Sequence, residues 1–148
     1  MKTHVARFFA VVALATVAFT RSADANAPAG RYTTTGGTVY DTKTKLTWQQ
    51  AVAPGTYTWA GAKTYCSGLN LGDTGWRLPT VKELQTIVDD SQKNPSIDTT
   101  AFPSTPADAF WSSSPFAGSS SVWQVKFDIG DTYGTQYIDD LDHVRCVR

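Results

Sequence analysis

The chain has 148 residues, 41% of them hydrophobic, and its 13 basic and 13 acidic residues cancel to a net charge of zero. This length and composition predict one globular domain with a single, modest core. Nothing in this balanced charge suggests the strongly basic face that nucleic-acid binding requires, so we expect no nucleic-acid partner.

The first 25 residues have the pattern of a cleavable signal peptide. Lys2 and Arg7 give a positive start, residues 8–20 form an apolar run, and Ala23-Asp24-Ala25 fits the small-residue pattern before a cleavage site. The apolar run is shorter than the roughly 20 residues of a membrane-spanning helix, and an uncleaved anchor is the alternative. Cleavage leaves 10 basic and 12 acidic residues, a net charge of −2, and no second apolar run long enough to span a membrane. The sequence therefore predicts a secreted or periplasmic protein with no transmembrane segment after cleavage.

The next stretch predicts a lead-in and a hairpin. Residues 26–37 are small, polar and rich in Thr and Gly, and we expect them to be flexible. Two β-prone runs follow at residues 38–41 and 45–49. The tight turn that residues 42–44 allow between them predicts a β-hairpin.

Two helices are predicted after the hairpin. Thr58 is a suitable N-cap for a helix from Trp59 to about Ser67, whose apolar face points Cys66 inward. Thr80 and Glu83 have the spacing of a capping box and predict the start of a second helix. A polar, Pro-containing loop is expected from residue 89 to residue 109.

The last third of the chain predicts β-structure. We expect strands at residues 110–114, 122–128, 132–138 and 143–148, with a Ser/Gly loop at 112–121 after the first of them. In the second of these strands Trp123, Val125 and Phe127 alternate with polar residues, which is typical of a half-buried strand. Because strands and helices are segregated along the chain, the sequence predicts an α+β fold with an antiparallel sheet.

Cys66 and Cys146 are the only cysteines. In an oxidising compartment an even pair indicates a disulfide, with a buried pair of free thiols as the alternative. Two cysteines and one histidine beyond the leader fall short of a tetrahedral metal site, so we expect no metal there.

Several motifs together resemble the Lcl C-terminal domain family, which is named for a collagen-like bacterial adhesin. The most specific are Gly75-Trp76-Arg77-Leu78-Pro79-Thr80 and Val144-Arg145-Cys146-Val147-Arg148, and the resemblance covers residues 38–148. It implies a C-type-lectin-like fold, with two helices packed on an antiparallel sheet, paired termini, and a helix cysteine bridged to the last strand. The adhesin domain is associated with sulfated polysaccharides, but this chain has neither a collagen-like region nor a basic charge.

The residues that could carry chemistry are few. Beyond the leader the chain has one glutamate, which the capping box explains, and one histidine, His143, with no evident nucleophile beside it, so we predict no catalytic residues and no cofactor. The acidic cluster at 139–142 lacks EF-hand spacing, and we interpret it as a solvated turn rather than a metal site. Arg77 is expected to pair with a carboxylate or with loop carbonyls.

Of the five tryptophans, we assign four to the core and select Trp111, beside the Ser/Gly loop, as the best ligand contact. Ser112 and Ser113 are the predicted polar partners of Trp111 in the ligand site. The resulting hypothesis is a non-catalytic binding module that recognises a glycan or a cell-surface protein through its long loops. The alternatives are an enzyme on the related formylglycine-generating scaffold, which needs reactive thiols, and a structural component of the envelope.

Overall fold

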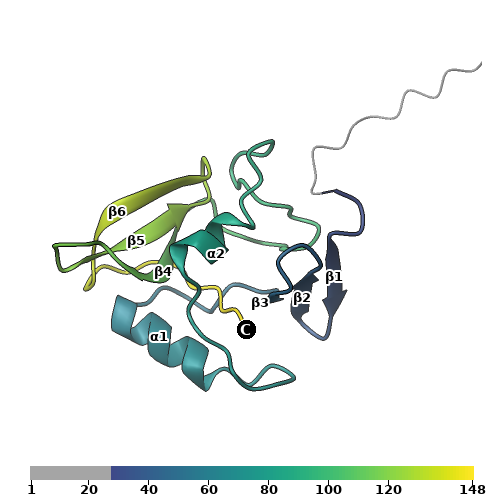
Figure 1. The fold of residues 1–148 in the computed structure, drawn as a ribbon, viewed down its shortest axis with the longest axis horizontal. Coiled ribbons are helices and arrows are strands. Elements are labelled where there is room, and N and C mark those ends of the chain that lie inside the picture. The colour runs from purple at the N-terminus through teal and green to yellow at the C-terminus, as the bar shows by residue number, and fades with distance from the viewer. Residues whose placement is uncertain (1–27) are drawn as a thin grey trace, which may run out of the picture.

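A computed structural model describes residues 28–148 and contains two small antiparallel sheets and two short helices (Figure 1). The predicted signal peptide at residues 1–25 lies outside the described residues. Strands and helices occupy separate parts of the chain, so the α+β prediction is confirmed. Among residues 28–148, no helix is long and apolar enough to cross a membrane.

The first sheet has the order β1-β2-β3, from β1 (Tyr32–Thr35), β2 (Thr38–Asp41) and β3 (Thr47–Gln49). The predicted hairpin is therefore present, although its second strand begins at residue 47 rather than 45. The expected flexible lead-in at 26–37 is described from residue 28 onward, and there it is not an unstructured segment, because β1 lies within it and pairs with β2. Tertiary contacts explain the difference, since the Tyr32 ring packs edge-on against Phe102, with 5.2 Å between ring centroids.

The C-terminal segment continues this sheet on the other side of β3. Residues 144–148 run beside β3 and the residues that follow it, and the Gln49 amide donates to the Cys146 carbonyl at 2.9 Å. Val147 forms bridges with both Trp48 and Arg77. The C-terminal segment therefore pairs with β3 through isolated bridges rather than as a regular strand, and the first strand β1 lies at the opposite edge of the sheet.

Both predicted helix starts are confirmed. Helix α1 (Trp59–Gly68) begins at its N-cap Thr58, whose hydroxyl accepts a hydrogen bond from the Gly61 amide. Helix α2 (Val81–Gln85) begins with the full capping box of Thr80 and Glu83. Helix α2 is only five residues long, and turns carry the chain on through Ile87 to the following loop.

The second sheet has the order β4-β5-β6, from β4 (Ala109–Pro115), β5 (Ser121–Lys126) and β6 (Asp131–Tyr137). Its two faces bury different side chains. Phe110 and Val125 are paired and belong to one core cluster, whereas Trp111 and Val122 belong to the other. The first cluster lies towards the first sheet, and the second surrounds Cys66 and Cys146.

The long segment between α2 and β4 contributes to the core. Ile97 and Phe102 have no exposed surface and pack in the first cluster, and Ser96 and Thr105 are also buried. Their spacing fits neither a helix nor a strand period, so periodicity gave no signal for their burial. The expectation of a polar surface loop with ligand contacts at 89–109 therefore does not describe residues 96–102.

Candidate functional site

A mainly apolar groove lies between α2 and one face of the second sheet. It is lined by Val81, Lys82 and Gln85 from α2, by Trp123 from β5 and by Thr132 from β6. Its volume of about 270 Å³ suits a single ring-sized group. An apolar floor with a few polar groups at its rim is the usual composition of a small-molecule binding site.

The ring of Trp123 is held from the side by Phe116. The two rings pack edge to face, with their centroids 5.1 Å apart. Gly134 of β6 leaves the space for this arrangement, because a Cβ atom at position 134 would overlap the Phe116 ring and lie 3.2 Å from the Trp123 ring. The orientation of the half-buried Trp123 side chain is therefore fixed by its neighbours.

A β-bulge lies opposite Trp123. Between the pairs Val122↔Gln136 and Gln124↔Tyr133, β5 advances by two residues and β6 by three. The extra residue falls at Gly134–Thr135, beside the Phe116 and Trp123 rings. Bulges are enriched beside functional sites, where they redirect side chains.

Ser112 and Ser113, which the sequence selected as ligand contacts, and their neighbour Ser114 join the elements that form the groove. The Ser112 hydroxyl donates to the Trp123 carbonyl at 2.5 Å, and the Ser114 hydroxyl accepts from the Val81 amide at 3.0 Å. The Ser113 amide donates to the Pro79 carbonyl at 2.7 Å. These bonds join β4 to both β5 and the start of α2, so the three serines position the groove.

The start of α2 is fixed by an ion pair as well as by its cap. The Arg77 guanidinium donates to both carboxylate oxygens of Glu83, at 2.8 and 2.5 Å, and the same carboxylate accepts from the Thr80 amide. The hydrogen bonds from Arg77, aided by those from Thr80, lower the pKa of Glu83 to about 2 against the opposing effect of burial. The predicted carboxylate partner of Arg77 is confirmed, and the Glu83 carboxylate is engaged by both Arg77 and the helix cap.

The tryptophans divide differently from the sequence assignment. Trp111 and Ser112 have no exposed surface, and the Trp111 indole donates to the Tyr57 carbonyl at 2.5 Å. A ring in this position has no face to offer an external ligand, so burial gives Trp111 a packing role. Trp48 and Trp76 are buried as assigned, whereas Trp59 and Trp123 are only half-buried.

Sequence periodicity could not separate these tryptophans. Trp123, Val125 and Phe127 follow the alternation of one strand face. Val125 and Phe127 belong to the first core cluster, whereas Trp123 lies outside this cluster and is only half-buried. A weak signal was present in the neighbouring sequence, since a glycine at position 134 inside an expected strand indicates a bulge or a close approach.

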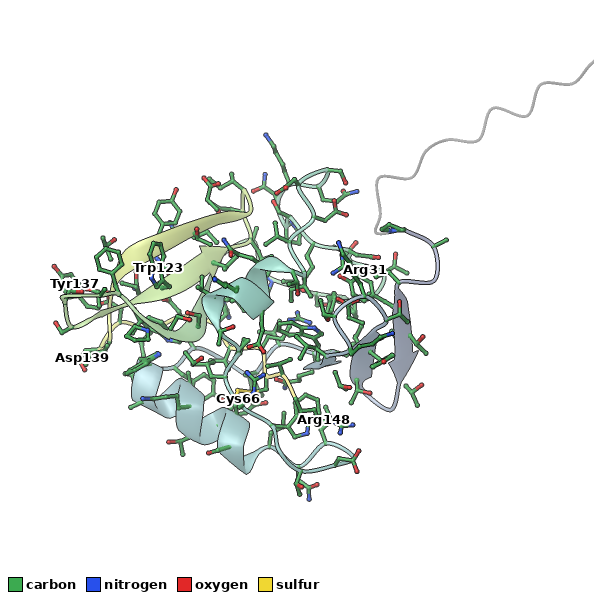
Figure 2. The ribbon with its side chains drawn as sticks, viewed as in Figure 1. Arg31, Cys66, Trp123, Tyr137, Asp139 and Arg148 are labelled. Atoms are coloured by element: carbon green, nitrogen blue, oxygen red, sulfur yellow. A yellow bond between two sulfur atoms is a disulfide. The ribbon has the colours of Figure 1, made fainter. Side chains whose placement is uncertain are left out.

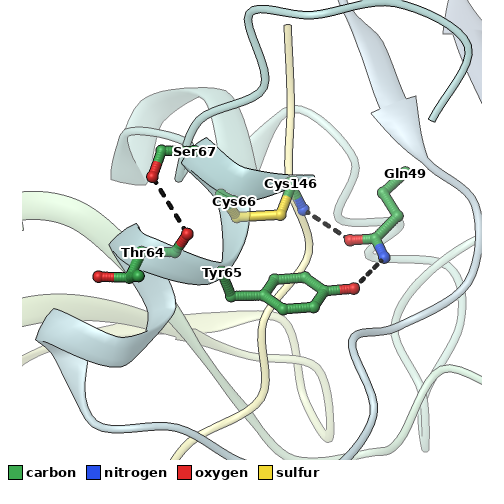
Figure 3. Close-up of a disulfide and its surroundings, with 6 residues drawn as sticks. All are labelled: Gln49, Thr64, Tyr65, Cys66, Ser67 and Cys146. Atoms are coloured by element: carbon green, nitrogen blue, oxygen red, sulfur yellow. Dashed lines mark hydrogen bonds between the residues drawn. A yellow bond between two sulfur atoms is a disulfide. The ribbon is translucent and has the colours of Figure 1, made fainter. Parts of the chain in front are cut away.

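The disulfide between Cys66 and Cys146 is present, with 5.4 Å between the Cα atoms (Figure 3). Gln49 lies beside it, accepting from the Cys146 amide at 3.2 Å and donating to the Tyr65 hydroxyl at 2.9 Å. The bridge joins α1 to the C-terminal segment, and it fits an oxidising compartment. No cysteine is left free in the chain.

The acidic turn and His143 form no metal centre. Within residues 28–148 no group of three or more His, Cys, Asp or Glu side chains could hold a metal ion. Asp142 is buried at the end of the turn, and that burial, with the nearby charges of Asp108 and Asp140, raises its pKa to about 6 against the opposing charge of Lys126. The Nε2 atom of His143 lies 3.8 Å from a carboxylate oxygen of Asp108.

Two other shallow hollows lie along β1, lined by Arg31, Tyr32 and several aspartates. Arg31 is already paired with Asp41 at 2.9 Å and also donates to the Thr86 carbonyl. The Arg31 side chain at these hollows is therefore engaged within the protein, and their aromatic ring, Tyr32, packs edge-on against Phe102.

The fold and the groove define a small, disulfide-bonded α+β domain with an aromatic surface site. The chain belongs to the Lcl C-terminal domain family, whose model matches residues 37–148. Comparisons with curated proteins and with solved structures found no match.

Proposed function

We propose that this protein is an exported, non-catalytic binding module that recognises a glycan at the Trp123 groove. The observation that carries the proposal is a half-buried tryptophan ring in an apolar groove whose rim bears an ammonium, an amide and a hydroxyl, from Lys82, Gln85 and Thr132. Sugars bind to such surfaces because their apolar C–H face packs on an aromatic ring while their hydroxyls hydrogen-bond to the rim.

Preorganisation supports the same conclusion. Phe116 and Gly134 fix the ring, the serines of β4 join the groove walls, and the Arg77–Glu83 pair fixes the start of α2. A site whose side chains are already held in place loses less conformational entropy when a ligand binds. The ligand surface thus lies on the sheet and α2, and not on Trp111.

Membership of the Lcl C-terminal domain family is compatible with a binding role. The pairing of the C-terminal segment with β3, and the bridge from α1 to that segment, support the proposal of a C-type-lectin-like fold. The same disulfide supports export to the periplasm or the medium.

Two other functions are weaker. The formylglycine-generating scaffold requires reactive thiols, and both cysteines of this chain are joined in a disulfide with no exposed surface. A purely structural envelope component would not need the fixed ring and polar rim of the groove.

A glycan array probed with the purified protein tests the proposal. We expect binding that Trp123→Ala abolishes and Tyr133→Ala preserves, since Tyr133 is an exposed ring on the same sheet but not in the groove. Circular dichroism checks the fold of each variant. If Trp123→Ala does not fold, Gln85→Ala, which changes an exposed side chain of the groove, takes its place. Glycan binding that is unaffected by folded groove variants would refute this site.

A further inference from the structure

We infer that the ligand is an extended, uncharged β-1,4-linked glycan that lies along the second sheet from the Trp123 groove to Tyr137. This inference rests on the proposed function and specifies the length and the charge of the ligand. Tyr137 was not selected by the sequence analysis, and it carries the most exposed large apolar side chain of the described residues, with 68% of its surface accessible.

Strand register places Tyr137 on the same face as Trp123. Tyr137 pairs directly with Ser121, and directly opposed residues of an antiparallel pair point to the same side of the sheet. Ser121 and Trp123 are two residues apart on β5 and therefore share a face. Phe116, which contacts Trp123 and lies against Gly134, is on this face as well. We call Trp123, Phe116 and Tyr137 the aromatic strip; Figure 2 shows its two ends, Trp123 and Tyr137, at the same end of the molecule.

The length of the strip sets the length of the ligand. Two residues along a strand and one strand across separate the Cα atoms of Trp123 and Tyr137 by about 8 Å. This separation is wider than one pyranose ring, so two rings of the protein can each contact a different sugar of one chain. β-1,4-Linked sugars with equatorial bonds form flat ribbons whose apolar faces match such a surface.

The charges along the strip favour an uncharged chain. Lys82 is the single cation in the groove lining, whereas Asp139 is exposed two residues beyond Tyr137. A polyanion such as a sulfated glycan would gain one favourable charge at one end and meet an unfavourable one at the other. An N-acetylated sugar instead offers amide groups that can pair with Gln85 and Thr132 at the groove.

Tyr133 provides a matched control for Tyr137. It is on the same strand and 39% exposed, but it pairs with Gln124 and therefore points to the opposite face, where the Lys126 ammonium lies 5.2 Å from its ring centroid. Removing Tyr133 changes the exposed aromatic surface of β6 without changing the aromatic strip.

Isothermal titration of the purified protein with N-acetylglucosamine, its β-1,4-linked tetramer and heparin tests the inference. We expect the tetramer to bind more tightly than the monosaccharide, and heparin to bind more weakly than the tetramer. Tyr137→Ala should weaken tetramer binding about three- to tenfold, the contribution of one aromatic contact, without changing monosaccharide binding. Tyr133→Ala should change neither, and Trp123→Ala should abolish both.

The outcomes separate this inference from the proposed function. Tetramer binding that survives Tyr137→Ala but is lost with Trp123→Ala would overturn the strip and leave the groove as the site. Heparin binding tighter than tetramer binding would overturn the uncharged ligand class. No binding of the tetramer to the wild-type protein would also overturn the inference, and the wider glycan array would then decide the proposed function.

Discussion

The guanidinium of Arg145 lies over the ring of Phe102, 4.7 Å from its centroid, and the whole Arg145 side chain is buried. It donates to the Gln49 and Gln50 carbonyls at 3.2 and 2.6 Å and to the Thr105 hydroxyl at 2.7 Å. One side chain therefore ties the C-terminal segment to the end of β3 and to the long segment before β4. Burial lowers the pKa of Arg145 to about 9, so the group stays protonated at neutral pH.

Arg145→Ala should lower the free energy of unfolding by about 3 kcal/mol or more, because it leaves a cavity and unpaired buried acceptors. Chemical denaturation measures the loss. Arg148→Ala is the control, since Arg148 pairs with Asp73 at the surface and its removal should cost at most about 1 kcal/mol. Similar losses for the two variants would show that the buried guanidinium does not tie these segments together.

Replacing both bridged cysteines, as Cys66→Ala with Cys146→Ala, should lower the free energy of unfolding by about 2–5 kcal/mol. The bridge joins residues 80 apart in sequence, so its loss releases a long loop in the unfolded chain. Denaturation with and without reductant measures the effect. Reductant should destabilise the wild-type protein and leave the double variant unchanged; the opposite result would contradict a structural role for the bridge.

Acidification should weaken the start of α2 through Glu83. The pKa of Glu83 is about 2 in the folded protein, below its ordinary value of 4.5. The ionised carboxylate therefore stabilises the folded protein fully above pH 4.5, and this stabilisation is lost as the pH falls towards 2. Denaturation at a series of pH values should show a shallower decline for Glu83→Gln than for the wild type. A parallel decline of stability with pH in the wild type and in Glu83→Gln would exclude the Glu83 carboxylate as the source of the pH dependence.

Thr80→Ala, which removes the cap hydroxyl, should lower the free energy of unfolding by about 1 kcal/mol at neutral pH.

Asp142 should act in the opposite direction. Because its folded-state pKa is raised to about 6 from an ordinary value of 3.8, protonation stabilises the folded protein, and this stabilisation is lost as the pH rises through 6. Asp142→Asn should therefore raise the melting temperature at pH 7 and remove this part of the pH dependence. Asp140→Asn, at an exposed position, is the comparison and should have a smaller effect. A lower melting temperature for Asp142→Asn at pH 7 would contradict the prediction.

Gly134→Ala should displace Phe116 and lower the free energy of unfolding by about 1–3 kcal/mol through overpacking. Phe116→Ala introduced with Gly134→Ala should relieve the overlap, so a double-mutant cycle should give a strong favourable coupling between the two positions. Gly68→Ala is the control, because a Cβ atom there meets no neighbour within 4 Å. Additive effects at positions 116 and 134 would show that the bulge does not depend on this close approach.

Local patterns in the sequence determined the helix starts, the hairpin and the class of fold. Caps depend on residues three positions apart, such as Thr80 and Glu83, and strand alternation on residues two apart, so both are visible without tertiary contacts. The disulfide also followed from the sequence, because two cysteines in an expected oxidising compartment have only each other as partners.

Tertiary structure alone decided which aromatic ring faces solvent. Trp111 and Trp123 lie on neighbouring strands in similar local sequence patterns, and the difference between them comes from how far each core cluster extends under the second sheet. The place of Phe102 under Arg145 and the strand at Tyr32–Thr35 were decided in the same way. Burial is a sum over contacts between segments distant in sequence, and no periodicity within one segment records that sum.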